Sequence, residues 1–172
     1  IRAVLAALMS PSWGVYSGYE LFEHLPVREG SEEYLDSEKY QLRPRDYDQA
    51  IKEGRSLAPY LAHLNRLRNA HPALQQLRNL RFHHVDNENL LCFSKTDPGS
   101  DDAVLVVVSL NSTYTQIGTT SLDMPALGLD WNDRMVVHDE MGGGGSDYEW
   151  GQFNFVRLDP HVEPAHVLVV RR

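Results

Sequence analysis

The sequence contains one cysteine, no long apolar run and no excess of positive charge. Cys92 stands alone among 172 residues, so an intrachain disulfide is impossible, which suits a reducing cytoplasm. No apolar stretch approaches the ~20 residues of a membrane-spanning helix, and no signal peptide is visible. The formal net charge is −8, from 16 basic and 24 acidic residues, whereas a nucleic-acid-binding protein usually carries a basic face. We therefore expect a cytoplasmic protein that binds neither nucleic acid nor membrane.

Apolar residues make up 42% of the chain and charged residues 23%, which is enough for the cores of one or two globular domains. The chain begins at Ile1, without an initiator methionine, inside a segment of helical pattern. We interpret it as a fragment or a processed piece of a longer protein.

The first part of the chain has the pattern of a helix, a strand and a long loop. Apolar residues recur at helical spacing between Ile1 and Leu8, and Pro11 ends that helix because proline cannot continue its hydrogen-bond ladder. Residues 13–17 predict a short buried strand, after which a polar, glutamate-rich loop runs to Asp46. A buried strand that releases a long charged loop is how α/β barrels build binding sites.

A second helix follows the loop. Ser56 can cap its N-terminus, and His71-Pro72 ends it. Its apolar face repeats at Leu57, Leu61, Leu64 and Leu67.

The remaining sequence predicts an all-β domain. Residues 80–85 and 90–95 are expected to form a hairpin, and residues 103–110, almost continuously apolar and β-branched, predict a central strand. Further strands are expected at residues 115–122, 134–139, 153–158 and 166–170. Several short strands separated by turn signals indicate an antiparallel β-sandwich, so the predicted boundary lies near residue 75.

Some side chains of the long loop suit carbohydrate chemistry. Retaining glycosyl transfer needs two carboxyl groups about 5 Å apart, and carboxylates are plentiful between Glu20 and Asp48. For any one of them, however, residue type alone favours a solvated or salt-bridged loop carboxylate. Glu20 follows the predicted strand directly and is interpreted as a structural or supporting group. Lys39 and Tyr40 are adjacent, and an ammonium and a phenol can hold the hydroxyls and the apolar face of a sugar. The alternative is a tyrosine packed on a barrel rim beside a solvated lysine.

No metal or cofactor site is predicted. His83 and His84 are adjacent, so in a strand they point to opposite faces, and Cys92 lacks partners at metal-ligand spacing. Residues 14–18 do not form the Gly-x-Ser-x-Gly turn of serine hydrolases. The glycines at 142–145 lack a following Lys-Ser or Lys-Thr, so they predict a hairpin tip and not a phosphate loop.

The chain resembles the C-terminal part of α-amylase-family barrel enzymes. Residues 2–11 and 13–20 look like the seventh helix and eighth strand of those barrels, and residues 64–74 look like the eighth helix and its exit. The β domain is similar to their C-terminal sandwich. The implied fold class is α/β plus all-β: residues 1–75 form the end of a (β/α)8 TIM barrel with its last strand and long loop, and residues 76–172 form the β-sandwich.

Three stretches, at residues 17–23, 33–46 and 154–160, more specifically resemble the α-1,4-glucan:maltose-1-phosphate maltosyltransferases of actinobacteria. The resemblance implies transfer of a maltosyl unit from maltose 1-phosphate to the non-reducing end of an α-1,4-glucan, with release of phosphate and retention through a covalent glycosyl-enzyme. It places the nucleophilic Asp, the acid/base Glu and a third Asp before Ile1, so this chain would hold no catalytic residue. Lys39 and Tyr40 match the pair that holds the maltosyl unit of the donor. The implied partners are the two substrates, the remainder of the same enzyme and a second copy in a homodimer, with no cofactor.

Two alternatives stay open. One is a related α-amylase-family hydrolase or a trehalose-forming enzyme with the same barrel and sandwich. The other is a non-catalytic glucan-binding module, whose marker would be exposed aromatic platforms on the sandwich; Trp131, Tyr148 and Trp150 are its candidates, with core packing as the ordinary fate of each.

Overall fold

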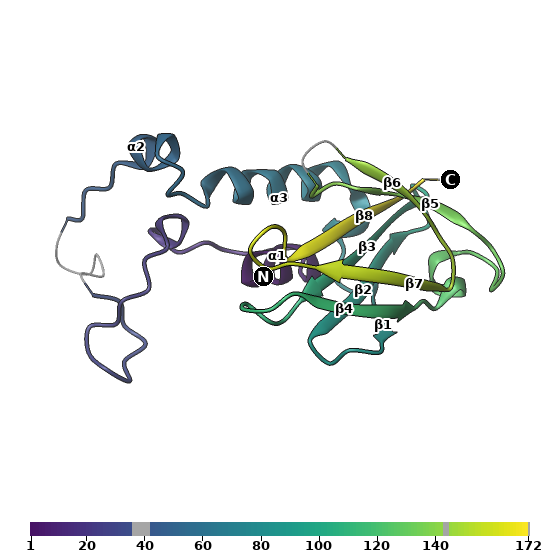
Figure 1. Cartoon of the computed structure of the whole chain (residues 1–172). Helices are drawn as coiled ribbons and strands as arrows, with labels where there is room; N and C mark the ends of the chain where they lie inside the picture. Colours follow the sequence, from purple (N-terminus) through teal and green to yellow (C-terminus); the bar gives the residue numbers. More distant parts are fainter. Residues whose placement is uncertain (36–41, 143–144, 172) are drawn as a thin grey trace. The chain divides into compact units, whose positions relative to one another are not determined.

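The computed structural model describes residues 1–35, 42–142 and 145–171. The chain divides into two compact units. One combines residues 1–12 with residues 67–172 and holds every strand of the sheet, so we call it the β unit; the other comprises residues 13–66, and we call it the loop unit. Figure 1 follows both along the chain by colour.

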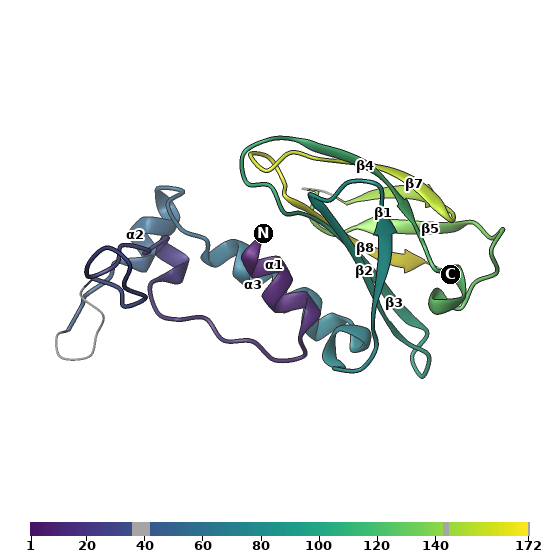
Figure 2. The same cartoon turned by 90° about the horizontal axis from the view of Figure 1, so that it is seen from below.

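The β unit contains one antiparallel sheet with the strand order β6-β5-β8-β3-β2-β1-β4-β7. Its strands are β1 (Leu80–Val85), β2 (Leu90–Asp97), β3 (Asp102–Ser109), β4 (Gln116–Ser121), β5 (Met135–Asp139), β6 (Ser146–Trp150), β7 (Phe153–Leu158) and β8 (Ala165–Arg171). Figure 2 shows the sheet folded over, with β4 and β7 in one layer and β2, β3 and β8 in the other. The predicted antiparallel β-sandwich is therefore confirmed.

The core of the β unit lies between these layers. Apolar side chains from β2, β3, β5, β7 and β8 meet there, together with the short 3₁₀ helix η3 (Met124–Leu127). β3 pairs with β2 on one side and β8 on the other, and residues 103–108 are all buried. A strand buried on both faces has no reason to alternate polar and apolar residues, which explains its continuous apolar sequence.

The segment before the sheet is held to it by an acidic side chain. Asp102, at the start of β3, accepts hydrogen bonds from the His71 ring at 2.8 Å and from the backbone N–H of Ala73 at 2.9 Å. The 3₁₀ helix η2 (Pro72–Gln75) is thereby fixed against β2 and β3, which it contacts.

Helices occur in both units. In the β unit, the predicted helix α1 (Arg2–Met9) is confirmed and buries Ala3, Val4, Ala7 and Leu8, whereas Ile1 and Leu5 are only half-buried. The loop unit contains the 3₁₀ helix η1 (Tyr19–Leu21), the short helix α2 (Tyr47–Lys52) and most of α3 (Ala58–Ala70). The predicted second helix is confirmed, and the Ser56 hydroxyl accepts from the N–H of Ala58 at its start, at 3.1 Å.

The strand predicted at residues 13–17 is wrong, because these residues form no strand. A strand is held by hydrogen bonds to a neighbouring strand, and this segment bonds elsewhere. The Trp13 indole donates to Asn65 Oδ1 at 3.0 Å, and the Tyr16 carbonyl accepts from the N–H of Tyr19 at 3.0 Å. Among the residues that the structure covers, none of the helices is long and apolar enough to span a membrane.

Candidate functional site

The long loop of the loop unit carries the residues that the sequence singled out. Lys39 and Tyr40 themselves lie outside the described residues, but the chain on both sides of them is described up to Leu35 and from Leu42. The site is therefore built from the side chains that fix these flanks.

A carboxylate and two arginines form the centre of the loop. Arg45 makes a two-pronged ion pair with Glu23, with Nε–Oε1 at 2.9 Å and Nη2–Oε2 at 3.1 Å. The Arg45 side chain is 6% exposed and that of Glu23 17%. The hydrogen bond from Arg45 lowers the pKa of Glu23, and the positive charges of Arg45 and Arg43 add to this against the opposing effect of burial. Glu23 is therefore held ionised at neutral pH.

Arg43 connects this ion pair to the other side of the loop. Its Nη2 lies 3.4 Å from Glu23 Oε1, and its Nη1 donates to the Leu35 carbonyl at 2.8 Å. The side chain thus bridges the two flanks of the segment that contains Lys39 and Tyr40. Because an arginine fork makes several directed hydrogen bonds at once, it fixes orientation as well as distance.

The first flank is further ordered by a short ladder. The N–H of Val27 donates to the Glu33 carbonyl, and the N–H of Leu35 donates to the Leu25 carbonyl, both at 2.8 Å. The Tyr34 ring packs edge-on against Tyr16, with ring centroids 6.0 Å apart. The loop is consequently structured up to Leu35 by backbone bonds, an aromatic contact and the arginine bridge.

Glu20 is a structural residue, as we interpreted it from the sequence. Its Oε2 accepts from the N–H of Gly18 at 3.1 Å, and its carbonyl accepts from the N–H of Leu57 at 2.7 Å. Gly18 has a φ of 98°, and a Cβ at this position would overlap the Glu23 carboxylate. Only glycine lets the chain turn here while Glu23 reaches Arg45.

A hollow of about 210 Å³ lies beside the ion pair. Its lining combines the charges of Glu23 and Arg43 with apolar and aromatic side chains, which are Leu21, Phe22, Leu25, Tyr34 and Leu35, and with the His24 ring. Such a mixture can contact both the hydroxyls and the apolar face of a sugar ring.

We expect Glu23→Gln to loosen the loop, because glutamine keeps a hydrogen-bond acceptor for Arg45 but loses the charge that holds both arginines. Losing a charge-assisted pair of this kind should lower the free energy of local opening by roughly 1.4 kcal/mol, which makes the open state about tenfold more populated. The measurement is hydrogen exchange of the Val27 and Leu35 amides. Glu53→Gln, at an exposed loop carboxylate beside Arg55, is the matched control and should leave both rates unchanged. Equal exchange rates in Glu23→Gln and the unaltered chain would show that the ion pair does not order the loop.

The histidines and the cysteine that were considered as metal ligands lie apart from this loop in the sequence. His83 is buried and hydrogen-bonded to Ser94, whereas His84 is exposed, and within the described ranges no three His, Cys, Asp or Glu side chains are grouped to hold a metal ion. Cys92 is buried, which raises the pKa of its thiol to about 12. A thiol with so high a pKa is a poor nucleophile.

Two of the three candidate aromatic platforms are exposed. Trp131 and Tyr148 lie at the surface, but Trp150 is buried in the core cluster, so its candidacy as a platform is wrong. Trp150 points inward because it ends β6, opposite Met135 of β5, where the sheet covers the core.

The model of the family described as "GLGE, C-terminal" matches residues 82–170, which is more than half of the chain. Curated proteins are similar to the chain over its entire length. A protein of Streptomyces coelicolor named alpha-1,4-glucan:maltose-1-phosphate maltosyltransferase 2 is 60% identical over 172 residues, which is 100% of this chain. Proteins named alpha-1,4-glucan:maltose-1-phosphate maltosyltransferase from Mycobacterium tuberculosis and Mycolicibacterium smegmatis are 58% and 60% identical over 98% of it. The chain spans about a quarter of the length of these relatives, 24–25%.

Proposed function

The chain belongs to the GLGE C-terminal family, and from this premise we propose that it is the C-terminal part of a maltosyltransferase. The proposed reaction moves a maltosyl unit from maltose 1-phosphate to the non-reducing end of an α-1,4-glucan and releases phosphate. The observation that carries the proposal is identity of 58–60%, over at least 98% of the chain, to proteins named for this activity. The β unit alone would not distinguish a transferase from a hydrolase, since one fold hosts many functions.

In this proposal the loop unit contributes to the donor site, and the catalytic carboxylates lie elsewhere in the enzyme. Residues 1–75 would belong to the end of a (β/α)8 barrel. The helix, long loop and helix of this part support the assignment. The proposed compartment is the cytoplasm and the proposed assembly a homodimer, which light scattering of the intact enzyme would test.

The experiment that tests the function is phosphorolysis by the intact enzyme. Glycogen and inorganic phosphate should yield maltose 1-phosphate, because a retaining transferase works in both directions. A hydrolase would release only free sugars, and a trehalose-forming enzyme would release trehalose. Formation of either without maltose 1-phosphate would refute the proposal.

Lys39 and Tyr40 are proposed to hold the maltosyl unit of the donor at the ring remote from the bond that breaks. Contacts there supply binding energy that fixes the reacting ring in place. A hydrogen bond to a sugar hydroxyl contributes about 1 kcal/mol, so Tyr40→Phe should lower kcat/KM for maltose 1-phosphate about fivefold. Lys39→Ala removes a charged donor and should lower it about tenfold. Neither variant should abolish the chemical step.

Steady-state kinetics with maltose 1-phosphate decide this prediction, beside thermal melts that show each variant to be folded. Lys52→Ala, which removes an exposed lysine in the last turn of α2, is the control for Lys39→Ala and should be indistinguishable from the unaltered enzyme. Unchanged kcat/KM in well-folded Lys39→Ala and Tyr40→Phe variants would mean that the pair is only structural.

A further inference from the structure

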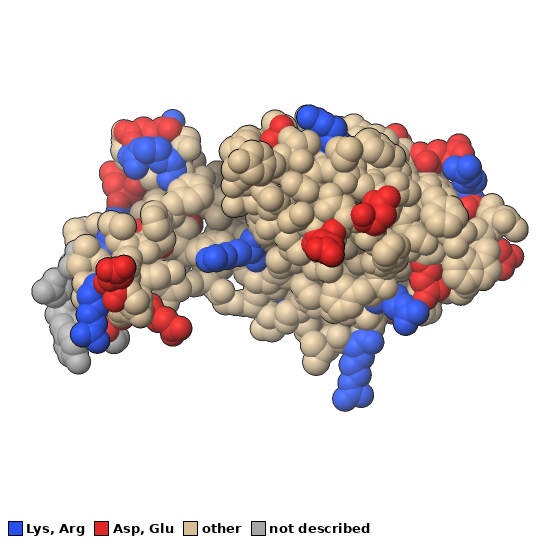
Figure 3. Space-filling model, turned by 60° about the horizontal axis from the view of Figure 1, so that its bottom comes forward, with Lys and Arg blue, Asp and Glu red and all other residues tan. Residues whose placement is uncertain are grey.

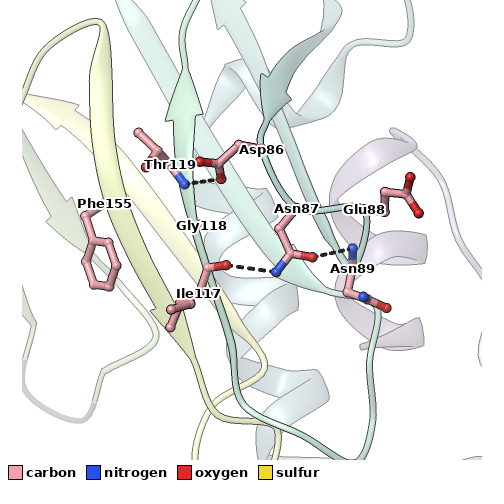
Figure 4. Close-up of a pocket in the computed structure, with 8 residues that line it drawn as sticks. All are labelled: Asp86, Asn87, Glu88, Asn89, Ile117, Gly118, Thr119 and Phe155. Atoms are coloured by element: carbon pink, nitrogen blue, oxygen red, sulfur yellow. Dashed lines mark hydrogen bonds between the residues drawn. The ribbon is translucent and has the colours of Figure 1, made fainter.

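A second hollow lies in the β unit, where the hairpin between β1 and β2 meets β4. Its volume is about 520 Å³, within the range of small-molecule sites. The hairpin residues 86–89 form one side, Ile117, Gly118 and Thr119 of β4 lie between, and Phe155 of β7 lies on the other side (Figure 4).

The hairpin wall is fixed by its own side chains. Asp86 Oδ1 accepts from the N–H of Thr119 at 2.6 Å, and Asn87 Nδ2 donates to the Ile117 carbonyl at 2.8 Å (Figure 4). Asn87 Oδ1 in turn accepts from the N–H of Asn89 at 2.8 Å. The wall is therefore preorganised, and binding a ligand against it would not need to order the hairpin first.

A glycine in β4 allows this close approach. A Cβ on Gly118 would lie 2.9 Å from Asp86 Oδ1 and 3.0 Å from Leu90 Cδ1. A larger residue would crowd the Asp86 carboxylate and the Leu90 side chain, which lie against β4. Glycine inside a strand commonly marks such a close backbone approach.

The polar groups that face outward are free to bind. The bonds above leave the second carboxylate oxygen of Asp86, the Glu88 carboxylate and the Asn89 carboxamide without a partner among the described residues. Asp86, Glu88 and Asn89 are all exposed. They present several hydrogen-bond acceptors and one amide donor at the rim of the hollow.

Large apolar side chains continue from the other side of the hollow. Phe155 is 67% exposed and Phe153 65%, and alternation along β7 places both on its outer face. Ile117 lies on the same face of β4 and is also exposed. Exposed apolar patches of this kind mark interaction sites more often than single exposed residues do.

The chemistry of this surface fits a neutral polyol. The two carboxylates repel anions, which disfavours phosphates and nucleic acids, and the eight lining residues include no Lys or Arg. Arg157, cross-strand from Ile117, adds a guanidinium with several N–H donors at the margin. In Figure 3 the charged side chains on the visible face of the β unit are isolated spots in a largely uncharged surface. A sugar chain presents both hydroxyls for the rim and apolar ring faces for the phenylalanines.

We propose that the hollow between the β1–β2 hairpin and Phe155, together with Phe153, is a binding site for an α-1,4-linked glucan chain. The site shares no residue with the proposed donor site, since all its residues belong to the β unit. The choice of an α-1,4-glucan over other polyols rests on the proposed function, whereas the site itself rests on the surface described here.

The test is affinity electrophoresis of the 172-residue chain in native gels that contain soluble glycogen. Dextran, an α-1,6-linked glucan, is the control polymer. Glycogen should retard the chain and dextran should not. Phe155→Ala should weaken the apparent affinity for glycogen about fivefold, as expected for one lost ring contact, and Asn89→Ala about threefold. Both residues are exposed, so the variants should melt as the unaltered chain does.

Trp131→Ala tests the competing site, because Trp131 is an exposed aromatic side chain of the β unit that was a candidate glucan platform on sequence grounds. Unchanged retardation in Phe155→Ala and Asn89→Ala, or loss of retardation in Trp131→Ala alone, would overturn the proposed site. Equal retardation by dextran would overturn its linkage preference. If the 172-residue chain self-associates, the comparison is repeated by pull-down on starch granules of the intact enzyme and of its Phe155→Ala variant. If phosphorolysis yields no maltose 1-phosphate, the proposed transferase reaction is refuted, but the glycogen-binding results still stand. Failure of the proposed reaction can therefore be distinguished from failure of the proposed binding site.

Discussion

Replacing Lys95 by alanine should lower the free energy of unfolding of the β unit by about 3 kcal/mol. Lys95 lies in β2 and is fully buried, which is rare for a lysine. Its ammonium donates to the Leu74 carbonyl at 3.4 Å and to the Gln76 carbonyl. Both acceptors are at the end of η2, where the side chain caps carbonyls that have no helical partner.

Two losses add up in this variant. The stem of the lysine packs in the interior, and removing buried methylene groups leaves a cavity that costs about 2 kcal/mol or more. The Leu74 carbonyl, in a buried residue, also loses its donor, which costs about 1–3 kcal/mol. A third effect has the opposite sign. Burial of the ammonium lowers the pKa of Lys95, and the positive charge of Arg68 lowers it further. Removing this disfavoured charge recovers part of the lost stability. We therefore place the net effect near the lower end of the sum.

Urea unfolding, followed by tryptophan fluorescence, to which the buried Trp150 contributes, measures the effect. Lys95→Met keeps most of the stem but not the donor, so it should lose roughly half as much stability as Lys95→Ala. Lys52→Ala is the exposed control and should change the free energy by less than about 0.5 kcal/mol. A loss below about 1 kcal/mol in Lys95→Ala would contradict the assigned role.

Sequence periodicity identified most strands but could not say which face of each is buried. In β7 the residues alternate strictly, and the outward positions hold Phe153 and Phe155. Hydrophobicity alone would have placed the phenylalanines inside and Asn154 outside. Asn154 is buried because its carboxamide accepts from the N–H of Gly151 at 2.9 Å and donates to the Gly151 carbonyl at 2.8 Å. A buried amide with all its partners at hand is stable, and that arrangement appears only once the chain is folded.

Elements without an apolar pattern were missed. β6 is exposed along residues 146–149, so only its pairing with β5 defines it. The helix α2 has six residues, too few for helical periodicity, and depends on the Asp46 side chain, which accepts from the N–H of Gln49 at 2.8 Å. Conversely, the apolar segment at residues 13–17 had the composition of a strand but lacks the neighbours that would make it one.

The loop that carries the proposed donor site shows the same limit. Lys39 and Tyr40 were identified by resemblance, because residue type alone favoured a packed tyrosine and a solvated lysine. Glu23 and Arg45 were not singled out, since 22 positions separate them and many other charged residues fill the loop. Only the fold brings one carboxylate into contact with two arginines, so a count of charges could not select this pair.

His83 makes the stability of the β unit depend on pH. The ring is 8% exposed and lies between two polar partners. Its Nδ1 accepts from the N–H of Asp123 at 3.1 Å, so the proton of the neutral ring is on Nε2, which donates to Ser94 Oγ at 2.8 Å. Burial lowers the pKa of His83 to about 4, which the Asp123 carboxylate opposes and Arg81 reinforces. Protonation would place a charge in the interior and remove the acceptor for Asp123.

The sign of the effect follows from linkage. Between the pKa of an unfolded histidine, 6.5, and the folded value of about 4, the unfolded chain binds the proton and the folded chain does not. Stability from His83 is therefore fully present above pH 6.5 and is lost as the pH falls toward 4. A difference of about 2.5 pKa units corresponds to about 3 kcal/mol.

We expect the free energy of unfolding to fall by about 3 kcal/mol between pH 7 and pH 4 through His83 alone. His83→Gln isolates this contribution, because glutamine keeps polar contacts but does not titrate. The variant should be less stable at pH 7 by about 1–2 kcal/mol, since it cannot reproduce both hydrogen bonds. Its disadvantage should shrink with falling pH until, near pH 4, it matches or exceeds the unaltered chain. Urea unfolding of both proteins at half-unit pH steps measures the difference in their free energies of unfolding. The contributions of the other acid-sensitive groups are the same in both proteins and cancel in this difference. A stability difference that stays constant from pH 7 to pH 4 would mean that His83 titrates alike in both states, and that burial of the ring does not set the acid limit of this fold.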